Sequence, residues 1–168
     1  MGLKSKNLDR VIEVVYEHPG KMFTIRELAK ATGIPRATVH SYLAELKKQG
    51  LVTKENRPAE TGLFKTKKAF FFAEKLITSG LIDFIIKELN PSCIILFGSV
   101  RKGESVRDSD IDLFIETPIK KDLHIEIFEK KLKHPLQLFI HKDIHELPPK
   151  LFNNIVNGIK LYGSFKAK

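Results

Sequence analysis

The sequence predicts an α/β protein of the α+β type in two domains: a helical domain over residues 1–68 and a small mixed sheet flanked by helices over residues 69–168. Apolar residues recur at helical spacing in the first third, whereas short apolar runs of strand length follow later. The charge changes as well. Residues 1–68 hold 14 lysines and arginines against 7 acidic residues, and the remainder holds 15 against 13. A basic module joined to a nearly neutral one indicates nucleic-acid binding attached to a second activity.

Composition excludes several classes of protein. The 168 residues are 42% hydrophobic and 29% charged, as in soluble globular proteins. The apolar runs fall far short of the roughly 18 residues that a membrane span needs, and the first residues lack the apolar segment of a secretory signal. The single cysteine, Cys93, precedes two isoleucines and is expected to be a buried thiol. We therefore expect a cytoplasmic protein without a membrane partner.

Helix start and stop signals divide the first third. An apolar pattern over residues 8–15 predicts a first helix. Thr24 and Glu27 form a capping box at the start of a second helix, which ends at Gly33. Pro35 opens a third helix that continues to about residue 50. Three helices joined by tight turns are therefore expected before residue 51.

A hairpin is expected after these helices, because apolar pieces at residues 51–53 and 62–65 flank a polar tip. The segment TIRELAKATGIPRATVHSYLAELKKQGLV resembles the winged helix-turn-helix family, and the resemblance covers residues 5–68. In such modules the start of the third helix enters the major groove. The resemblance thus implies duplex DNA as a partner. The expected contacts to bases or phosphates are Arg36, Thr38, His40 and Ser41, and the expected contacts to phosphate are Lys47, Lys48 and Arg57.

A linking helix is expected over about residues 67–79. Its three consecutive phenylalanines, Phe70 to Phe72, cannot all lie on one helical face. We therefore expect this helix to be covered on more than one side, either between the two domains or in a homodimer contact.

Two apolar runs enclose a polar loop between Ile94 and Glu116. The first run predicts a buried strand that ends at Gly98-Ser99, where a glycine lets backbone amides approach a phosphate. Asp110 and Asp112 stand one residue apart at the start of the second run and would share one face of a strand. Two adjacent carboxylates repel each other unless a cation joins them, and oxygen ligands suit Mg²⁺. The pattern therefore predicts a phosphate cradle beside a metal site.

The segment GSVRKGESVRDSDIDLFI resembles the signature of the DNA polymerase beta nucleotidyltransferase superfamily, in particular its minimal nucleotidyltransferases. The resemblance covers about residues 80–165. It implies transfer of a nucleotidyl group to a protein or nucleic-acid acceptor, and a small helical protein partner, as in toxin–antitoxin-like systems. It also implies catalytic residues that bind Mg²⁺ or Mn²⁺, Asp110 and Asp112, and residues that bind a nucleoside triphosphate (NTP, such as ATP): Gly98, Ser99, Arg101, Lys102 and Ser109.

One position departs from that family, which usually has a third carboxylate on the next strand. A helix is expected over residues 122–131 and a strand over residues 135–141, where Gln137 stands at the matching position. A glutamine is uncharged and cannot act as a base near neutral pH. Three interpretations stay open: a working transferase with unusual second-metal chemistry, a catalytically impaired nucleotide-sensing transcriptional regulator, or an antitoxin-like regulator whose second domain binds a protein partner.

Overall fold

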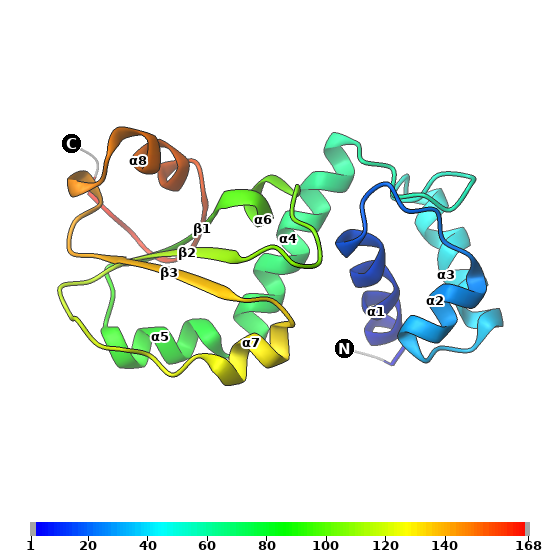
Figure 1. Cartoon of the computed structure of the whole chain (residues 1–168), viewed down its shortest axis with the longest axis horizontal. Coiled ribbons are helices and arrows are strands. Elements are labelled where there is room, and N and C mark those ends of the chain that lie inside the picture. Colours follow the sequence, from blue (N-terminus) through cyan, green and yellow to red (C-terminus); the bar gives the residue numbers. More distant parts are fainter. Residues whose placement is uncertain (1–2, 167–168) are drawn as a thin grey trace. The chain divides into compact units, whose positions relative to one another are not determined.

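The structure is a computed structural model that describes residues 3–166 (Figure 1). The chain separates into two compact units between Thr66 and Lys67. This point lies inside a helix, α4 (Gly62–Thr78), so one helix belongs to both units. No helix among the described residues is long and apolar enough to cross a membrane.

Three helices form most of the first unit: α1 (Leu3–Glu17), α2 (Ile25–Thr32) and α3 (Arg36–Lys48). The predicted capping box is present, because the Thr24 hydroxyl accepts from the Glu27 amide at 3.1 Å and the Thr24 amide donates to the Glu27 carboxylate at 2.8 Å. Gly33 ends α2 in the left-handed conformation, with φ of 68°. The buried side chains of α3 are Val39, Tyr42, Leu43 and Leu46.

The predicted second strand of the hairpin is wrong. Residues 62–65 form the first turn of α4, and the described chain here holds only an isolated bridge between Val52 and Pro58. The Thr61 hydroxyl accepts from the Phe64 amide at 3.2 Å, as a helix cap does. Phe64 then packs edge-on against Tyr16 of α1, with ring centroids 5.0 Å apart. The cap and this packing both support the first turn of α4, which begins five residues before the expected linking helix.

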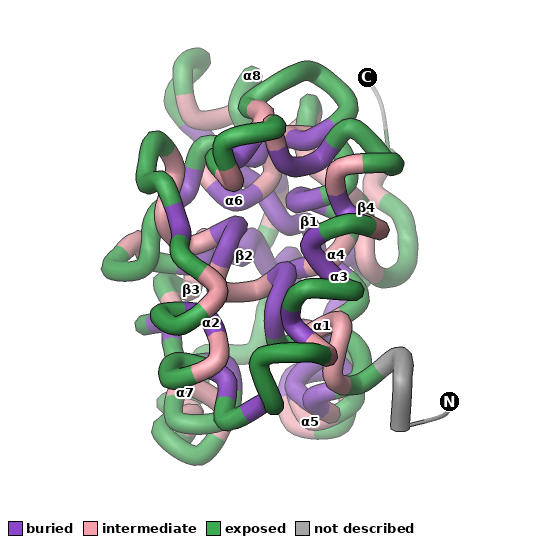
Figure 2. The backbone as a smooth tube through the Cα atoms, turned by 90° about the vertical axis from the view of Figure 1, so that its right-hand side faces the viewer, coloured by how far each residue is buried: buried purple, intermediate pink, exposed green. Residues whose placement is uncertain are grey.

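The second unit is built on a four-stranded mixed sheet in the order β3-β2-β1-β4. The strands are β1 (Cys93–Phe97), β2 (Ile111–Glu116), β3 (Leu136–His141) and β4 (Ile159–Gly163). β1 pairs antiparallel with both β2 and β4, whereas β2 and β3 are parallel. The two central strands, β1 and β2, are buried almost throughout, whereas the outer strands β3 and β4 are only partly covered (Figure 2).

Helices cover both faces of this sheet (Figure 1). One face packs against α8 (Pro149–Val156) and the short 3₁₀ helix η1 (Ile144–Glu146) through a core of seven buried residues: Cys93, Ile95, Phe97, Phe114, Ile144, Leu147 and Ile155. α4, α5 (Leu81–Leu89) and α7 (Glu126–Leu132) lie toward the other face. α6 (Gly98–Lys102) follows β1 directly.

The helix expected over residues 122–131 is shorter than predicted, because α7 begins only at Glu126. Before it, burial alternates along the chain: Leu123 and Ile125 are half-buried, and their neighbours are exposed. Alternation at period two is typical of extended chain, so the apolar residues of this segment contact the unit without forming a helix.

Candidate functional site

The end of β1 brings Gly98 against Asp112. Phe97, the last residue of β1, is the register partner of Asp112 on β2, so the next residue passes directly over the aspartate. Gly98 has φ of 72°, and a Cβ built on it would lie 1.8 Å from Asp112 Oδ2. Both the backbone conformation and the space require glycine. The close approach places the carboxylate at the point where the chain leaves β1 for α6.

The two predicted metal ligands differ in their surroundings. β2 begins at Ile111, so Asp110 lies just outside the strand and is exposed, whereas Asp112 lies within it and is half-buried. Burial raises the pKa of the Asp112 carboxyl, and the charge of Asp110 raises this pKa further. A divalent cation would relieve both effects. The donor set of two adjacent carboxylate oxygens therefore fits a hard cation such as Mg²⁺.

This raised pKa predicts a pH-dependent stability. The folded state holds the Asp112 proton more tightly than the unfolded state does, so the protonated carboxyl favours folding at low pH. This contribution to stability is lost as the pH rises above the ordinary pKa of an aspartate and through the raised pKa of Asp112. We expect Asp112→Asn to raise the melting temperature of the metal-free protein at pH 7 and to leave it nearly unchanged at pH 3. Thermal unfolding at both pH values measures this, and an equal shift at both would contradict it.

Gln137 lies beside the aspartates. In the parallel ladder of β2 and β3, Asp112 pairs with Gln137, so the strand that could supply a third carboxylate presents an exposed amide here. His141 pairs with Glu116 at the far end of β2 and stacks on Phe114. Among the described residues, no group of three or more His, Cys, Asp or Glu is placed to hold a metal ion. The site therefore has two carboxylates.

The other predicted nucleotide-binding residues lie on α6 and in the loop after it. Ser99 and Arg101 are half-buried on α6, and Lys102 is exposed at its end. Ser109 precedes the aspartates, but its hydroxyl accepts from the Val106 amide at 2.8 Å and so serves the loop itself. The structure thus brings Gly98 and Asp112 together and gives Ser109 a structural contact.

The predicted DNA contacts lie on α3 and in the turn between Val52 and Pro58. Three of the residues at the start of α3 are exposed: Arg36, His40 and Ser41. Thr38 is half-buried. Lys47 donates to the Lys54 carbonyl at 3.0 Å, which ties the end of α3 to the turn, while Lys48 and Arg57 are exposed. Cationic side chains thus lie on both the helix and the turn.

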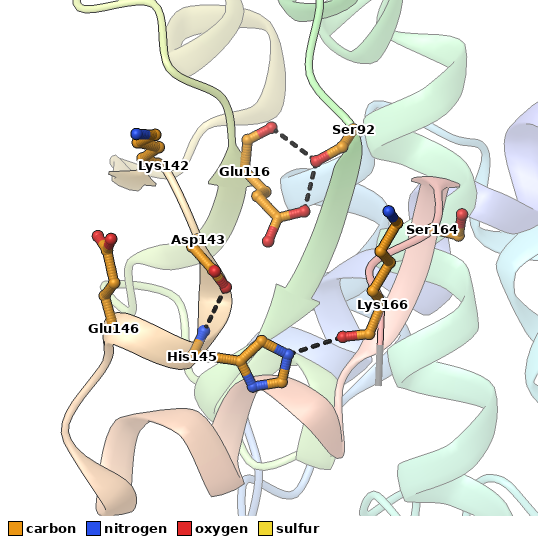
Figure 3. A pocket seen from close by; sticks show the side chains of 8 residues that line it. All are labelled: Ser92, Glu116, Lys142, Asp143, His145, Glu146, Ser164 and Lys166. Carbon is orange, nitrogen blue, oxygen red and sulfur yellow. Dashed lines mark hydrogen bonds between the residues drawn. The ribbon is translucent and has the colours of Figure 1, made fainter. Parts of the chain in front are cut away.

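A pocket of about 480 Å³ lies at the end of the sheet opposite to Asp112 (Figure 3). It is lined by Ser92, Glu116, Lys142, Asp143, His145, Glu146, Ser164 and Lys166. None of these residues has a functional role predicted from sequence. Glu116 is only 9% exposed, and its carboxylate accepts from the Ser92 hydroxyl and, at 2.9 Å, from the Ile144 amide. It therefore ties β1, β2 and η1 together.

The thiol of Cys93 lies next to this carboxylate and is buried in the core. Burial, with a smaller contribution from Glu116, raises the pKa of the Cys93 thiol to about 11. A thiol with such a pKa is protonated near neutral pH and is a poor nucleophile. Cys93 is thus a packing residue.

Two family models match the chain. Residues 10–61 match the MarR family, and residues 80–165 match the nucleotidyltransferase domain. The comparisons with curated proteins and with solved structures found no match. Both resemblances predicted from sequence are confirmed. Since the second match covers half of the chain, the protein belongs to the nucleotidyltransferase domain family and joins that domain to a MarR-family winged helix-turn-helix.

Proposed function

We propose that the chain is a DNA-binding protein whose second domain binds an NTP with Mg²⁺ or Mn²⁺ and transfers a nucleotidyl group to a hydroxyl of a protein or nucleic-acid acceptor. The observation that carries this proposal is the close approach of Gly98 to Asp112. It joins the turn that would hold the phosphates to a carboxylate that would hold the metal, although 13 residues separate the two along the chain.

Each residue has a proposed role at the site. Gly98 and Ser99 bind the phosphates of the NTP, and Arg101 or Lys102 offsets their charge. Asp110 and Asp112 hold the divalent cation and fix its position. When bound, such an ion stabilises negative charge on the transferred phosphoryl group and on the leaving pyrophosphate. The acceptor oxygen bonds to the α-phosphorus as the bond from that phosphorus to the oxygen of the β-phosphate breaks, so pyrophosphate leaves and the proton of the acceptor hydroxyl passes to water.

The pairing of Asp112 with Gln137 favours a second candidate function. Without a carboxylate at this position, the site lacks a general base for the acceptor hydroxyl, a contribution of typically 10²–10⁴-fold. An impaired domain that keeps nucleotide binding would act as a sensor and report the nucleotide to the DNA-binding domain. Transfer and binding therefore have to be measured separately.

The transfer assay uses labelled NTPs with Mn²⁺ and three acceptors: duplex DNA, RNA and the chain itself. We expect Asp110→Asn/Asp112→Asn to lower transfer by about 100-fold or more, because charge stabilisation by a metal is worth several kcal/mol. Asp108→Asn is the matched control, since Asp108 is an exposed carboxylate of the same loop. Transfer that survives the double substitution would overturn the assigned site. Absence of transfer together with retained NTP binding would favour the sensor.

DNA binding is tested by replacing Arg36, Lys47 and Lys48 with alanine. We expect weaker binding to duplex DNA, with the slope of log affinity against log salt reduced by up to about 3, because each phosphate contact contributes roughly one unit. Lys87, Lys120 and Lys150 replaced together form the control, because they are exposed lysines of the second unit that remove the same charge. Equal losses from both triple variants would mean that net charge alone drives binding.

A further inference from the structure

The segment between α6 and β2 carries Asp110 and is held in place by two buried side chains from elsewhere in the second unit. It has no helix or strand of its own from Glu104 to Asp110. Val106 and Ser109 close the loop with two bonds, because the Val106 amide donates to the Ser109 hydroxyl at 2.8 Å and the Ser109 amide donates to the Val106 carbonyl at 3.0 Å. Neither bond attaches the loop to the sheet. The Glu104 amide joins the start of the segment to α6 by donating to the Ser99 carbonyl at 2.9 Å, and the two side-chain attachments lie at Ser105 and Ser109.

The first attachment is Lys68 of α4. Its ammonium donates to the Ser105 carbonyl, and both residues are only 1% exposed. Burying an ammonium is strongly unfavourable unless it makes good hydrogen bonds. An apolar side chain would fill a buried helical position without this cost, so the presence of a lysine indicates that the bond to Ser105 matters to the fold. This bond reaches the loop five residues before Asp110.

The second attachment is His134, which is 2% exposed and precedes β3. Its Nδ1 lies 2.9 Å from the Ser109 carbonyl, and because a carbonyl can only accept, Nδ1 carries the proton. The ring packs edge-on against Phe72, one turn after Lys68 on α4, with centroids 5.3 Å apart. The same helix thus supports both attachments.

The neighbouring backbone completes the arrangement. The Ile111 amide donates to the Pro135 carbonyl at 2.9 Å, next to His134, and this bond begins the ladder that pairs Asp112 with Gln137. The residues immediately before and after Asp110 are therefore both bonded to the segment of residues 134–135. Lys68 fixes the opposite end of the loop.

We propose that Lys68 and His134 are positioning residues of the metal site: they hold the Ser105–Ser109 segment so that Asp110 stays beside Asp112, and they thereby set the affinity for the divalent cation. The inference rests on the proposed function, since it assigns the aspartates to a metal. Residues that orient metal ligands without touching the metal typically contribute 10–100-fold to affinity. Sites of this kind need their ligands held within about 0.5 Å.

The test measures Mn²⁺ affinity of the full chain by electron paramagnetic resonance. We expect Lys68→Met and His134→Leu each to weaken binding about 10–100-fold. His134→Asn is expected to restore most of the affinity, because an asparagine amide nitrogen takes the place of Nδ1 in donating to Ser109. Thr117→Val is the matched control, since Thr117 is only 3% exposed and its hydroxyl donates to the Leu89 carbonyl at 2.7 Å, just past the end of β2 that lies farthest from the aspartates.

Hydrogen exchange supplies a readout that does not depend on metal. We expect Lys68→Met and His134→Leu to speed exchange of the Val106 and Ile111 amides, with the β1 amides unchanged, whereas mere loss of stability would speed all of them. Wild-type Mn²⁺ affinity in both variants would overturn the inference, as would His134→Asn binding as weakly as His134→Leu. A wild-type chain that binds no Mn²⁺ would instead overturn the proposed function. In that case hydrogen exchange still tests the attachment, which would be overturned if the Val106 and Ile111 amides exchanged at the wild-type rate in Lys68→Met and His134→Leu.

Discussion

Gly98→Ala is expected to lower Mn²⁺ affinity by about 100-fold or more, because displacing a ligand should cost at least as much as the roughly 10–100-fold lost when only a residue that supports a ligand is removed. The added Cβ would lie 1.8 Å from Asp112 Oδ2, a distance that no real contact reaches. Either the carboxylate turns away or the end of β1 moves, and both separate the predicted phosphate turn from the predicted metal ligand. The left-handed φ of 72° adds about 1–2 kcal/mol of backbone strain.

Gly80→Ala separates the backbone strain of a positive φ from the steric contact with Asp112. Gly80 also has a positive φ, 86°, but a Cβ there would meet nothing within 4 Å. Both variants should lose comparable stability from the backbone, as measured by denaturant unfolding, and only Gly98→Ala should lose Mn²⁺ binding. Metal affinity that survives Gly98→Ala would mean that Asp112 is not a ligand.

Gln137→Asp is the second substitution with a large expected effect, and here the direction is a gain. The new carboxylate would stand beside Asp112 in the β2–β3 ladder and supply the missing base. If transfer is merely slow in the natural chain, the rate should rise by about 10²–10⁴-fold. Gln137 is exposed on an edge strand, so the change leaves the core intact. Single-turnover transfer with labelled NTP measures the gain.

Gln137→Asn is the control for size, because it shortens the side chain equally and keeps the amide. A third negative charge should also lower the melting temperature without metal, and Mn²⁺ should restore it. Equal rates in the aspartate and asparagine variants would show that the absence of a carboxylate at residue 137 does not limit transfer. No transfer by either variant would favour the nucleotide sensor.

Local patterns predicted the parts of the fold that depend on neighbours in sequence. The capping box at Thr24, the strands over residues 111–116 and 136–141, and the turn at Gly33 each follow from a few adjacent residues. The placement of Gln137 against Asp112 was instead implied by the resemblance to the nucleotidyltransferase superfamily, because the two residues lie on different strands. The roles of the aspartates stay a prediction.

The parts that sequence did not predict depend on distant partners. Residues 62–65 resemble a strand in isolation but form the first turn of α4, where Phe64 packs on Tyr16, 48 residues earlier. Lys68 resembles any lysine on an exposed helical face, and its burial becomes apparent only when Ser105, 37 residues later, is placed against it. Neither contact leaves a periodic signal, so no pattern of spacing could have indicated it.

The continuity of α4 has a consequence for truncation. A cut between Thr66 and Lys67, where the two units separate, would place Lys68 in the first turn of a shortened helix. The amide groups of a first turn lack helical partners, and helix ends fray. An isolated second unit could then lose metal affinity because its first attachment has melted, even if DNA binding has no part in the chemistry. Point substitutions on α3 remove predicted DNA contacts while keeping α4 whole, so they are the sounder way to ask whether the two proposed activities depend on each other.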